Sequence, residues 1–200
     1  MALNTYLYVE RPASVGAPLF FTFHGTGGDE HQFFDLAQTL LPAAHVISLR
    51  GDVSEHGALR FFRRKAEGVY DMEDLATRTK ALAEFIAAHK ARTKATRVVG
   101  LGYSNGANIL ASALMASPDL FTDVILMHPL IPWKPADVDS LSQTRVLITA
   151  GRRDPICPVN LTASLADYFK RQRAVVQTAW HDGGHDLRLE EVDAAKVFLG

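Results

Sequence analysis

The sequence contains a single cysteine, Cys157, in 200 residues. One thiol excludes an intramolecular disulfide and is typical of a reducing compartment, so we expect Cys157 to act as a small buried hydrophobic residue. No segment approaches the roughly 18 consecutive apolar residues that a membrane span requires. The first six residues have neither a basic leader nor an apolar core. These absences predict a cytoplasmic protein.

An excess of charge of either sign is also absent. The chain has 21 basic and 22 acidic side chains and a formal net charge of −1. This balance gives no indication of a nucleic acid or an anionic membrane as partner. Apolar residues make up 48% of the chain, as in ordinary globular proteins, and the length is typical of one domain covering residues 1–200. We therefore expect a local site for a small molecule, and the oligomeric state stays open.

Short apolar runs alternate with longer helical patterns along the whole chain. This order predicts an α/β fold with a mostly parallel sheet of about seven strands, helices on both faces and no cap domain. The strand candidates are 3–9, 18–24, 44–49, 96–101, 123–127, 144–150 and 174–180. The helix candidates are 31–41, 71–93, 105–117, 158–173 and 186–199.

The pentapeptide from Gly102 to Gly106 has the pattern GxSxG, with Ser104 at its centre. It lies between a predicted buried strand and a predicted helix, which is the context of the nucleophile elbow of α/β-hydrolases. Glycine is expected on both sides because a Cβ there would collide with the neighbouring backbone. Ser104 is therefore the candidate nucleophile.

A glycine-rich segment, His24 to Asp29, follows the second predicted strand. Backbone N–H groups in such a loop can approach an anion closely, which suits an oxyanion hole. We expect one donor from Thr26 and the other from Asn105, the residue after the nucleophile. The alternative is a glycine turn that only connects strand and helix.

A serine nucleophile needs a histidine base and an acid, and the chain order in this fold is Ser, Asp or Glu, then His. Asp154 follows the strand candidate 144–150, and His185 follows the last strand candidate through a Gly-Gly pair. His181 is the alternative base, but it is nearly within the strand. Other acids are less well placed, because they lie too close to His185 in sequence or belong to the preceding unit: Asp182, Asp186, Asp123 and Asp137. Four further histidines lack metal-ligand spacing and are expected at the surface or at caps: His31, His45, His56 and His89.

Two loops could form the substrate pocket. The segment 51–70 contains Arg60 and Phe61, which could form a wall with an arginine for an acidic acyl group; the alternative is a solvated basic turn with its phenylalanines in the core. Leu130 and Trp133 follow the strand candidate 123–127 and could line an acyl pocket or serve packing alone.

Four motifs together resemble the cap-less carboxylesterase and phospholipase family of α/β-hydrolases: HGTGGDE at 24–30, GYSNGA at 102–107, AGRRDPICP at 150–158 and GGHDL at 183–187. The segment 60–75 is similar to small bacterial esterases associated with hydroquinone resistance, and the acyl-protein thioesterases are more distant. The resemblance implies a triad of Ser104, Asp154 and His185, with Thr26 and Asn105 as oxyanion donors. Acyl-protein thioesterases usually carry glutamine where this chain has Asn105.

The resulting hypothesis is a serine carboxylesterase that cleaves small esters or thioesters through an acyl-enzyme, without metal or organic cofactor. The alternative from another class is a catalytically idle hydrolase fold that binds a small molecule. A thioesterase, a lactone hydrolase or a lysophospholipase would use the same machinery.

Overall fold

The structure is a computed structural model that describes residues 2–138 and 140–200. Its centre is a seven-stranded sheet with the order β1-β3-β2-β8-β9-β10-β11, parallel throughout except for the edge pair of β1 and β3. The strands are β1 (Tyr8–Arg11), β2 (Leu19–Phe23), β3 (His45–Leu49), β8 (Val98–Tyr103), β9 (Asp123–Met127), β10 (Arg145–Gly151) and β11 (Val175–His181). The predicted mostly parallel sheet is confirmed.

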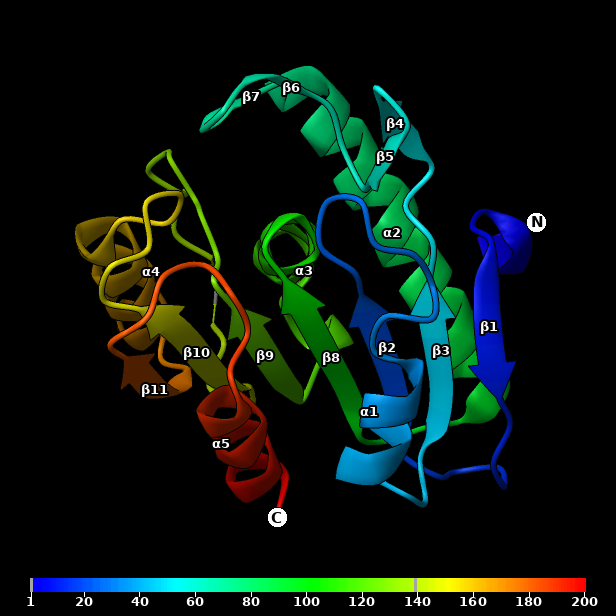
Figure 1. Cartoon of the computed structure of the whole chain (residues 1–200). Helices are drawn as coiled ribbons and strands as arrows, with labels where there is room; N and C mark the ends of the chain where they lie inside the picture. The colour runs from blue at the N-terminus through cyan, green and yellow to red at the C-terminus, as the bar shows by residue number, and fades with distance from the viewer. Residues whose placement is uncertain (1, 139) are drawn as a thin grey trace.

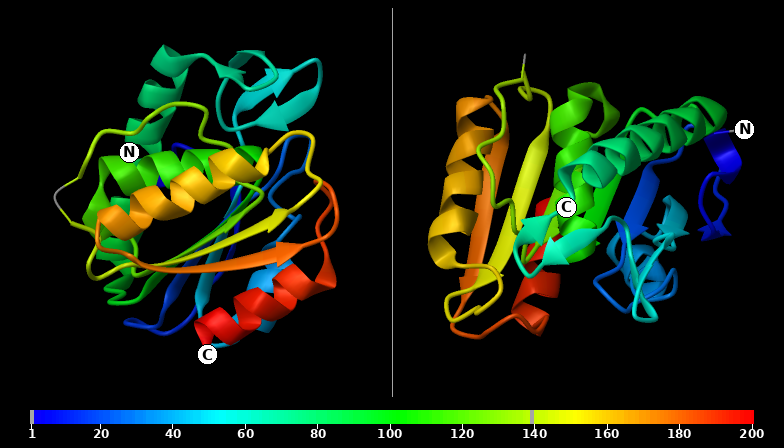
Figure 2. Two further views of the ribbon diagram at one scale, coloured as in Figure 1. Left: turned by 90° about the vertical axis from the view of Figure 1, so that its left-hand side faces the viewer. Right: turned by 90° about the horizontal axis from the view of Figure 1, so that it is seen from above.

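Helices cover both faces of this sheet (Figure 1). They are α1 (Phe34–Leu40), α2 (Met72–Thr93), α3 (Asn105–Ala116), α4 (Val159–Arg171) and α5 (Leu189–Leu199). Figure 2 shows α2, α3 and α4 on one face and α1 with α5 on the other. Each helix falls within a few residues of its predicted range. Among the described residues, none of the helices has both the length and the hydropathy needed to cross a bilayer.

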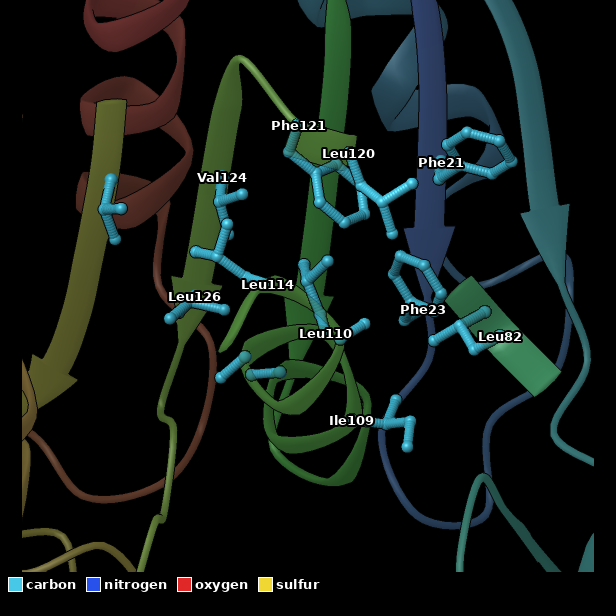
Figure 3. Close-up of a cluster of buried hydrophobic side chains, with 14 of the residues drawn as sticks. Phe21, Phe23, Leu82, Ile109, Leu110, Leu114, Leu120, Phe121, Val124 and Leu126 are labelled. Carbon is cyan, nitrogen blue, oxygen red and sulfur yellow. The ribbon is translucent and has the colours of Figure 1, made fainter. Parts of the chain in front are cut away.

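The longest helix, α2, shows how local signals and packing agree. The carboxylate of Asp71 caps its first turn by accepting a hydrogen bond from Asp74 N (3.2 Å). Its buried side chains include Leu82 and Phe85, so the apolar stripe faces the sheet as predicted. Figure 3 shows side chains from α2 (Leu82), α3 (Leu110) and β2 (Phe23) coming together in one buried cluster. Burial on both faces explains why the central strands are continuous apolar runs.

The N-terminal strand differs from its prediction over residues 3–9. Residues Ala2–Asn4 form a short 3-10 helix, and the strand begins only at Tyr8. Tyr6 is buried between them, with its ring against Phe85 (5.4 Å between centroids). Packing of this ring on α2, which has no local sequence signal, displaces the strand.

Residues 51–70 contain regular structure that the sequence did not predict. They form two small hairpins, β4 (Val53–Glu55) with β5 (Ala58–Arg60), and β6 (Arg64–Ala66) with β7 (Val69–Tyr70). Strands of two or three residues are too short to produce a recognisable alternation. The first hairpin turns at His56 and Gly57, which both have positive φ, as a tight hairpin turn requires. Figure 1 shows these four strands beyond the carboxyl ends of the parallel strands.

Two histidines expected at the surface or at caps are buried, so that prediction was wrong for them. His89 is fully buried on α2, where its ring lies against Phe85 and Tyr8. His45, at the start of β3, is 6% exposed and its Nε2 lies 2.6 Å from Glu10 Oε1. The carboxylate partner from the neighbouring strand is what allows a polar ring to be buried there.

Candidate active site

Ser104 occupies the sharp turn between β8 and α3 (Figure 1). Its backbone has φ 52° and ψ −117°, a strained conformation for a residue with a side chain. A Cβ on Gly102 would lie 2.6 Å from Gly106 O, and one on Gly106 would lie 2.3 Å from Phe23 O. Both flanking glycines are therefore required by space. The turn has the features that the sequence predicts for a nucleophile elbow.

Three side chains from three separate loops meet at the carboxyl edge of the sheet. Ser104 Oγ lies 2.9 Å from His185 Nε2, and His185 Nδ1 lies 2.8 Å from Asp154 Oδ2. The hydroxyl of Tyr103 donates to His185 O (2.9 Å), which fixes the loop between β11 and α5 over the elbow. The structure thus brings together the three residues that the sequence predicts as nucleophile, base and acid. This arrangement can carry a proton from the serine hydroxyl to the imidazole.

Asp154 is held in one orientation by donors on both of its oxygens. Oδ1 accepts hydrogen bonds from Ile156 N (2.8 Å) and Cys157 N (2.9 Å), while Oδ2 faces the rings of His128 and His185. Burial alone would raise the pKa of Asp154, but the hydrogen bonds from Cys157 N, His128 and His185 outweigh burial and lower the pKa. Asp154 is therefore an anion, as the acid of a triad must be.

The other candidate bases and acids lie elsewhere. His181 ends β11 and is buried, where its Nδ1 accepts a hydrogen bond from Gly183 N (3.0 Å). Asp182 is exposed and faces Arg152 (3.7 Å), and Asp186 is exposed as well. Neither of these carboxylates has His185 as a partner among the interactions of the described residues.

Two residues next to this site, His128 and Glu191, were missed by the sequence reasoning. His128 directly follows β9 and is fully buried, with Nδ1 2.7 Å from Asp154 Oδ2 and Nε2 3.1 Å from Glu191 Oε1. Its position after a strand that ends at the same edge as β8 and β10 was the signal that could have found it. Glu191 lies in the first turn of α5, where sequence alone gives it only a helix-start role.

The two proposed oxyanion donors, Thr26 and Asn105, line the same cavity as Ser104. Within the described part of the chain, neither backbone N–H donates to a protein acceptor, so both are free to bind an oxyanion. The side chain of Asn105 is buried, and its Oδ1 accepts from Phe61 N (2.7 Å), which ties the elbow to the segment after β5.

Comparison with known proteins gives the family of this fold and site. The model of the dienelactone hydrolase family matches residues 51–189. The chain belongs to the dienelactone hydrolase family. It is 40% identical over 175 residues to MhqD of Bacillus subtilis (strain 168), which carries the name of a hydrolase; the match covers 86% of this chain and 88% of MhqD.

Two solved structures have the same fold over nearly their whole length. The protein Atu2452 from Agrobacterium tumefaciens str. C58 is 54% identical with a TM-score of 0.96, covering 100% of this chain and 98% of that one. A Bacillus cereus carboxylesterase is 37% identical with a TM-score of 0.92, covering 98% and 94%. The predicted resemblance to α/β-hydrolase esterases is confirmed, and this dienelactone hydrolase family member is a hydrolase of the carboxylesterase type.

The cavity over Ser104 has a volume of about 290 Å³. Arg60 and Leu130, two of the four residues proposed for substrate binding, are among its lining residues. Phe61 is not, because its ring is buried against Phe23 (5.6 Å) and His24 (4.7 Å). Arg60 is buried as well, and burial lowers its pKa, although a guanidinium remains charged.

Trp133 lies outside this cavity. It lines a larger and more apolar groove of about 720 Å³ between α2, α3 and the segment after β9. Its ring contacts Tyr70 (6.0 Å between centroids), and Tyr70 in turn lines the cavity of Ser104. The size of the groove does not make it the reaction site, because its described lining residues include no histidine that could act as the base for a nucleophile. Trp133 therefore contacts Tyr70, a residue of the cavity wall, but does not itself line the cavity.

Two groups of side chains near the site have potential metal ligands within 4.8 Å of one another in the described residues. They are His128 with His181 and Glu191, and His128 with Asp154 and His185. In both groups the imidazole nitrogens face carboxylate oxygens at hydrogen-bond distance. Protons between these atoms satisfy them, so we assign none of these residues as a metal ligand.

Proposed function

We propose that this member of the dienelactone hydrolase family is a serine carboxylesterase that cleaves small esters or thioesters through an acyl-enzyme on Ser104. The observation that carries the proposal is the unbroken series of contacts from Ser104 Oγ through His185 to Asp154, with distances of 2.9 and 2.8 Å. In acylation, Ser104 Oγ attacks the carbonyl carbon while His185 Nε2 takes the hydroxyl proton. Asp154 keeps the second ring proton on His185 Nδ1 and stabilises the imidazolium.

The negative charge that develops on the carbonyl oxygen is placed against the backbone N–H groups of Thr26 and Asn105. These donors are preorganised, because Thr26 lies in the loop after β2, where Arg60 donates a hydrogen bond to its hydroxyl, and Asn105 is the first residue of α3. As the tetrahedral intermediate collapses, the bond to the leaving group breaks and His185 gives its proton to the departing alcohol or thiol. A water molecule then attacks the acyl carbon, with His185 again as base, and Ser104 is released.

The cavity favours a small substrate. Its volume of about 290 Å³ lies near the lower end of the range of roughly 300–1,000 Å³ for ligand pockets. Charged groups from the segment 51–70, Arg60, Arg64 and Glu67, line one side of it. A polar acyl or alcohol group is therefore accommodated better than a long alkyl chain.

The test compares the parent chain with Ser104→Ala on short-chain nitrophenyl esters and thioesters, with fluorophosphonate labelling read by mass spectrometry. We expect one adduct on Ser104 of the parent, none on the variant, and a loss of turnover on the order of 10⁴-fold or more. Equal hydrolysis by both proteins would refute the mechanism. Labelling of neither protein, together with reversible binding of an aromatic ester, would favour the idle binding protein instead.

A further inference from the structure

His128 and Glu191 form a buried polar unit behind Asp154, and the hydrogen bonds of each atom assign its charge. Asp154 accepts hydrogen bonds from two backbone N–H groups on Oδ1, and two imidazole nitrogens lie at hydrogen-bond distance from its Oδ2. Glu191 accepts hydrogen bonds from Thr149 Oγ1 (2.6 Å) and Arg188 N (2.8 Å), and His128 Nε2 (3.1 Å) and His181 Nε2 (3.4 Å) lie close to its oxygens. Hydrogen bonds hold the pKa of both carboxyl groups below the usual range despite their burial, so both are ionised.

The two histidines between these groups then differ in charge. His181 Nδ1 accepts from Gly183 N, so His181 is neutral with its proton on Nε2. His128 has a carboxylate oxygen at each ring nitrogen, at 2.7 and 3.1 Å, and both are nearer than His181 Nε2, which lies 3.4 Å from His128 Nε2. Only an imidazolium can donate to both carboxylates. Its side chain is completely buried, so water does not supply either contact.

We propose that His128 is a positioning residue, an imidazolium at neutral pH that links Glu191 to Asp154 and holds the Asp154 carboxylate against His185. The proposal rests on the triad function proposed above and goes beyond it by adding a second, charged histidine to the acid. Residue 128 is also held in the left-handed region, with φ 50°, an unusual conformation for a histidine. Its ring is thereby turned toward the loop after β10.

The groups around His128 come from every element packed against it. They are Thr149 from β10, Asp154 and Cys157 from the loop after β10, His181 from the end of β11, His185 from the next loop, Glu191 from α5, and Tyr103 from β8, whose ring lies 5.8 Å away. Asp154, His128 and Glu191 together carry one negative charge, the same as a lone catalytic carboxylate. The positive ring is nearer to His185 than Glu191 is, since it shares Asp154 Oδ2 with His185.

This placement has two consequences for the reaction. The imidazolium limits the rotation of Asp154, because Oδ2 accepts from both rings at 2.7 and 2.8 Å. It also places a positive ring 5.1 Å from the ring of His185, between centroids, where like charges repel each other. Burial alone would lower the pKa of His128, but the hydrogen bonds to Glu191 and Asp154 outweigh burial and raise the pKa.

The first test reads the charge of His128 without turnover. The ring nitrogens of the ¹⁵N-histidine-labelled parent are observed at about pH 8, well above the ordinary histidine pKa of about 6.5. The signals of His128 are assigned by their absence in His128→Asn, because asparagine tolerates the left-handed backbone. We expect both nitrogens of His128 to carry protons. If the parent shows no doubly protonated histidine ring at this pH, His128 is neutral and the proposal is wrong. This outcome needs no signal assignment, so it holds even if the variant does not fold.

The second test reads positioning through the pH profile of kcat/KM for a short nitrophenyl ester. We expect His128→Asn to shift the acid limb of the profile to higher pH by about one unit, because the positive charge is removed. The double variant His128→Asn with Glu191→Gln should shift the limb back toward that of the parent, because the unit then again carries one negative charge. His45→Asn, another buried histidine on a carboxylate but remote from Ser104, is the matched control and should leave the limb in place. A loss of activity at all pH values without movement of the limb would mean a purely structural role. If the parent hydrolyses no ester, the proposed function fails, while the nitrogen spectrum still decides the charge of His128.

Discussion

The guanidinium of Arg60 donates a 2.7 Å hydrogen bond to the hydroxyl of Thr26 and so connects the β4–β5 hairpin to the loop after β2. Thr26 is the residue whose N–H we propose as an oxyanion donor, and its side chain is otherwise exposed. Arg60 itself is anchored by contacts with Phe62 O (3.3 Å) and Glu55 (3.4 Å). A buried arginine thus determines where the exposed loop can lie.

We expect Arg60→Met to lower kcat by about tenfold to a hundredfold, because a hydrogen bond to a charged group contributes about 1.5–3 kcal/mol. Thr26→Val removes the hydroxyl but keeps the N–H, and it should lower kcat to a smaller extent. If Arg60 acts through Thr26, the double variant will be less impaired than the product of the two single effects. Independent, multiplying effects would instead mean that Arg60 binds the substrate directly.

The elbow requires glycine at position 106 for a reason that can be tested by stability alone. A Cβ there would lie 2.3 Å from Phe23 O and 2.5 Å from His24 O, both backbone atoms that cannot move aside. We expect Gly106→Ala to reduce the free energy of unfolding by about 1–3 kcal/mol or more. The control is Gly184→Ala in the loop between β11 and α5 that carries His185, where the nearest atom to the new Cβ would be 3.8 Å away. Equal thermal midpoints for the two variants would contradict this account of the elbow.

Sequence patterns identify the sheet and the three residues at its edge because both depend on local signals. Buried parallel strands are short apolar runs, and the polar residues that follow them lie at one edge of the sheet. Ser104, Asp154 and His185 each lie at most five residues after the end of such a run. The three residues therefore come together because the strands that they follow lie close to one another in the sheet.

The parts that sequence did not predict depend on contacts between distant segments. His128 follows β9 as directly as Ser104 follows β8, but its role is visible only when Glu191 of α5 is seen against its far nitrogen. The hairpins of residues 51–70 are likewise too short to have a pattern of their own. The ring of Trp133 faces a groove between α2 and α3 rather than the cavity of Ser104, because of the path of a segment without regular structure.

Acyl-chain preference should reflect the volume of the cavity. Short acyl groups fit within about 290 Å³, in a cavity whose lining includes the apolar Leu130 and Ile156 but also the charged Arg64 and Glu67, whereas a long alkyl chain exceeds this volume. We expect kcat/KM for nitrophenyl esters to be highest with two to four acyl carbons, an estimate based on the ordinary size of ligand pockets, and to fall by at least tenfold at twelve. The panel is measured below the solubility limit of each ester. A rate that rises steadily with chain length would show that the apolar groove near Trp133 receives the acyl chain.

Stability should depend on pH through the buried unit behind Asp154. Burial would raise the pKa of Glu191, but hydrogen bonds from His128 and Thr149 outweigh it and lower the pKa. A carboxyl group with a lowered pKa stabilises the fold above its unfolded value of about 4.3 and loses this contribution as pH falls through the folded pKa. The raised pKa of His128 has the opposite sign, since its contribution is complete below about pH 6.5 and is lost as pH rises through the folded pKa.

We therefore expect the free energy of unfolding of the parent to fall both below about pH 4 and on the basic side of the ordinary histidine range. Glu191→Gln should cost about 3 kcal/mol near neutral pH, because it removes one partner of a buried charged pair. It should also flatten the acid side of the curve, since the group that titrates there is gone. Glu190→Gln, on the neighbouring exposed residue of α5, is the matched control. Urea unfolding from about pH 3 to 9 decides the matter: parallel curves for the two variants would mean that Glu191 is not ionised in the native state.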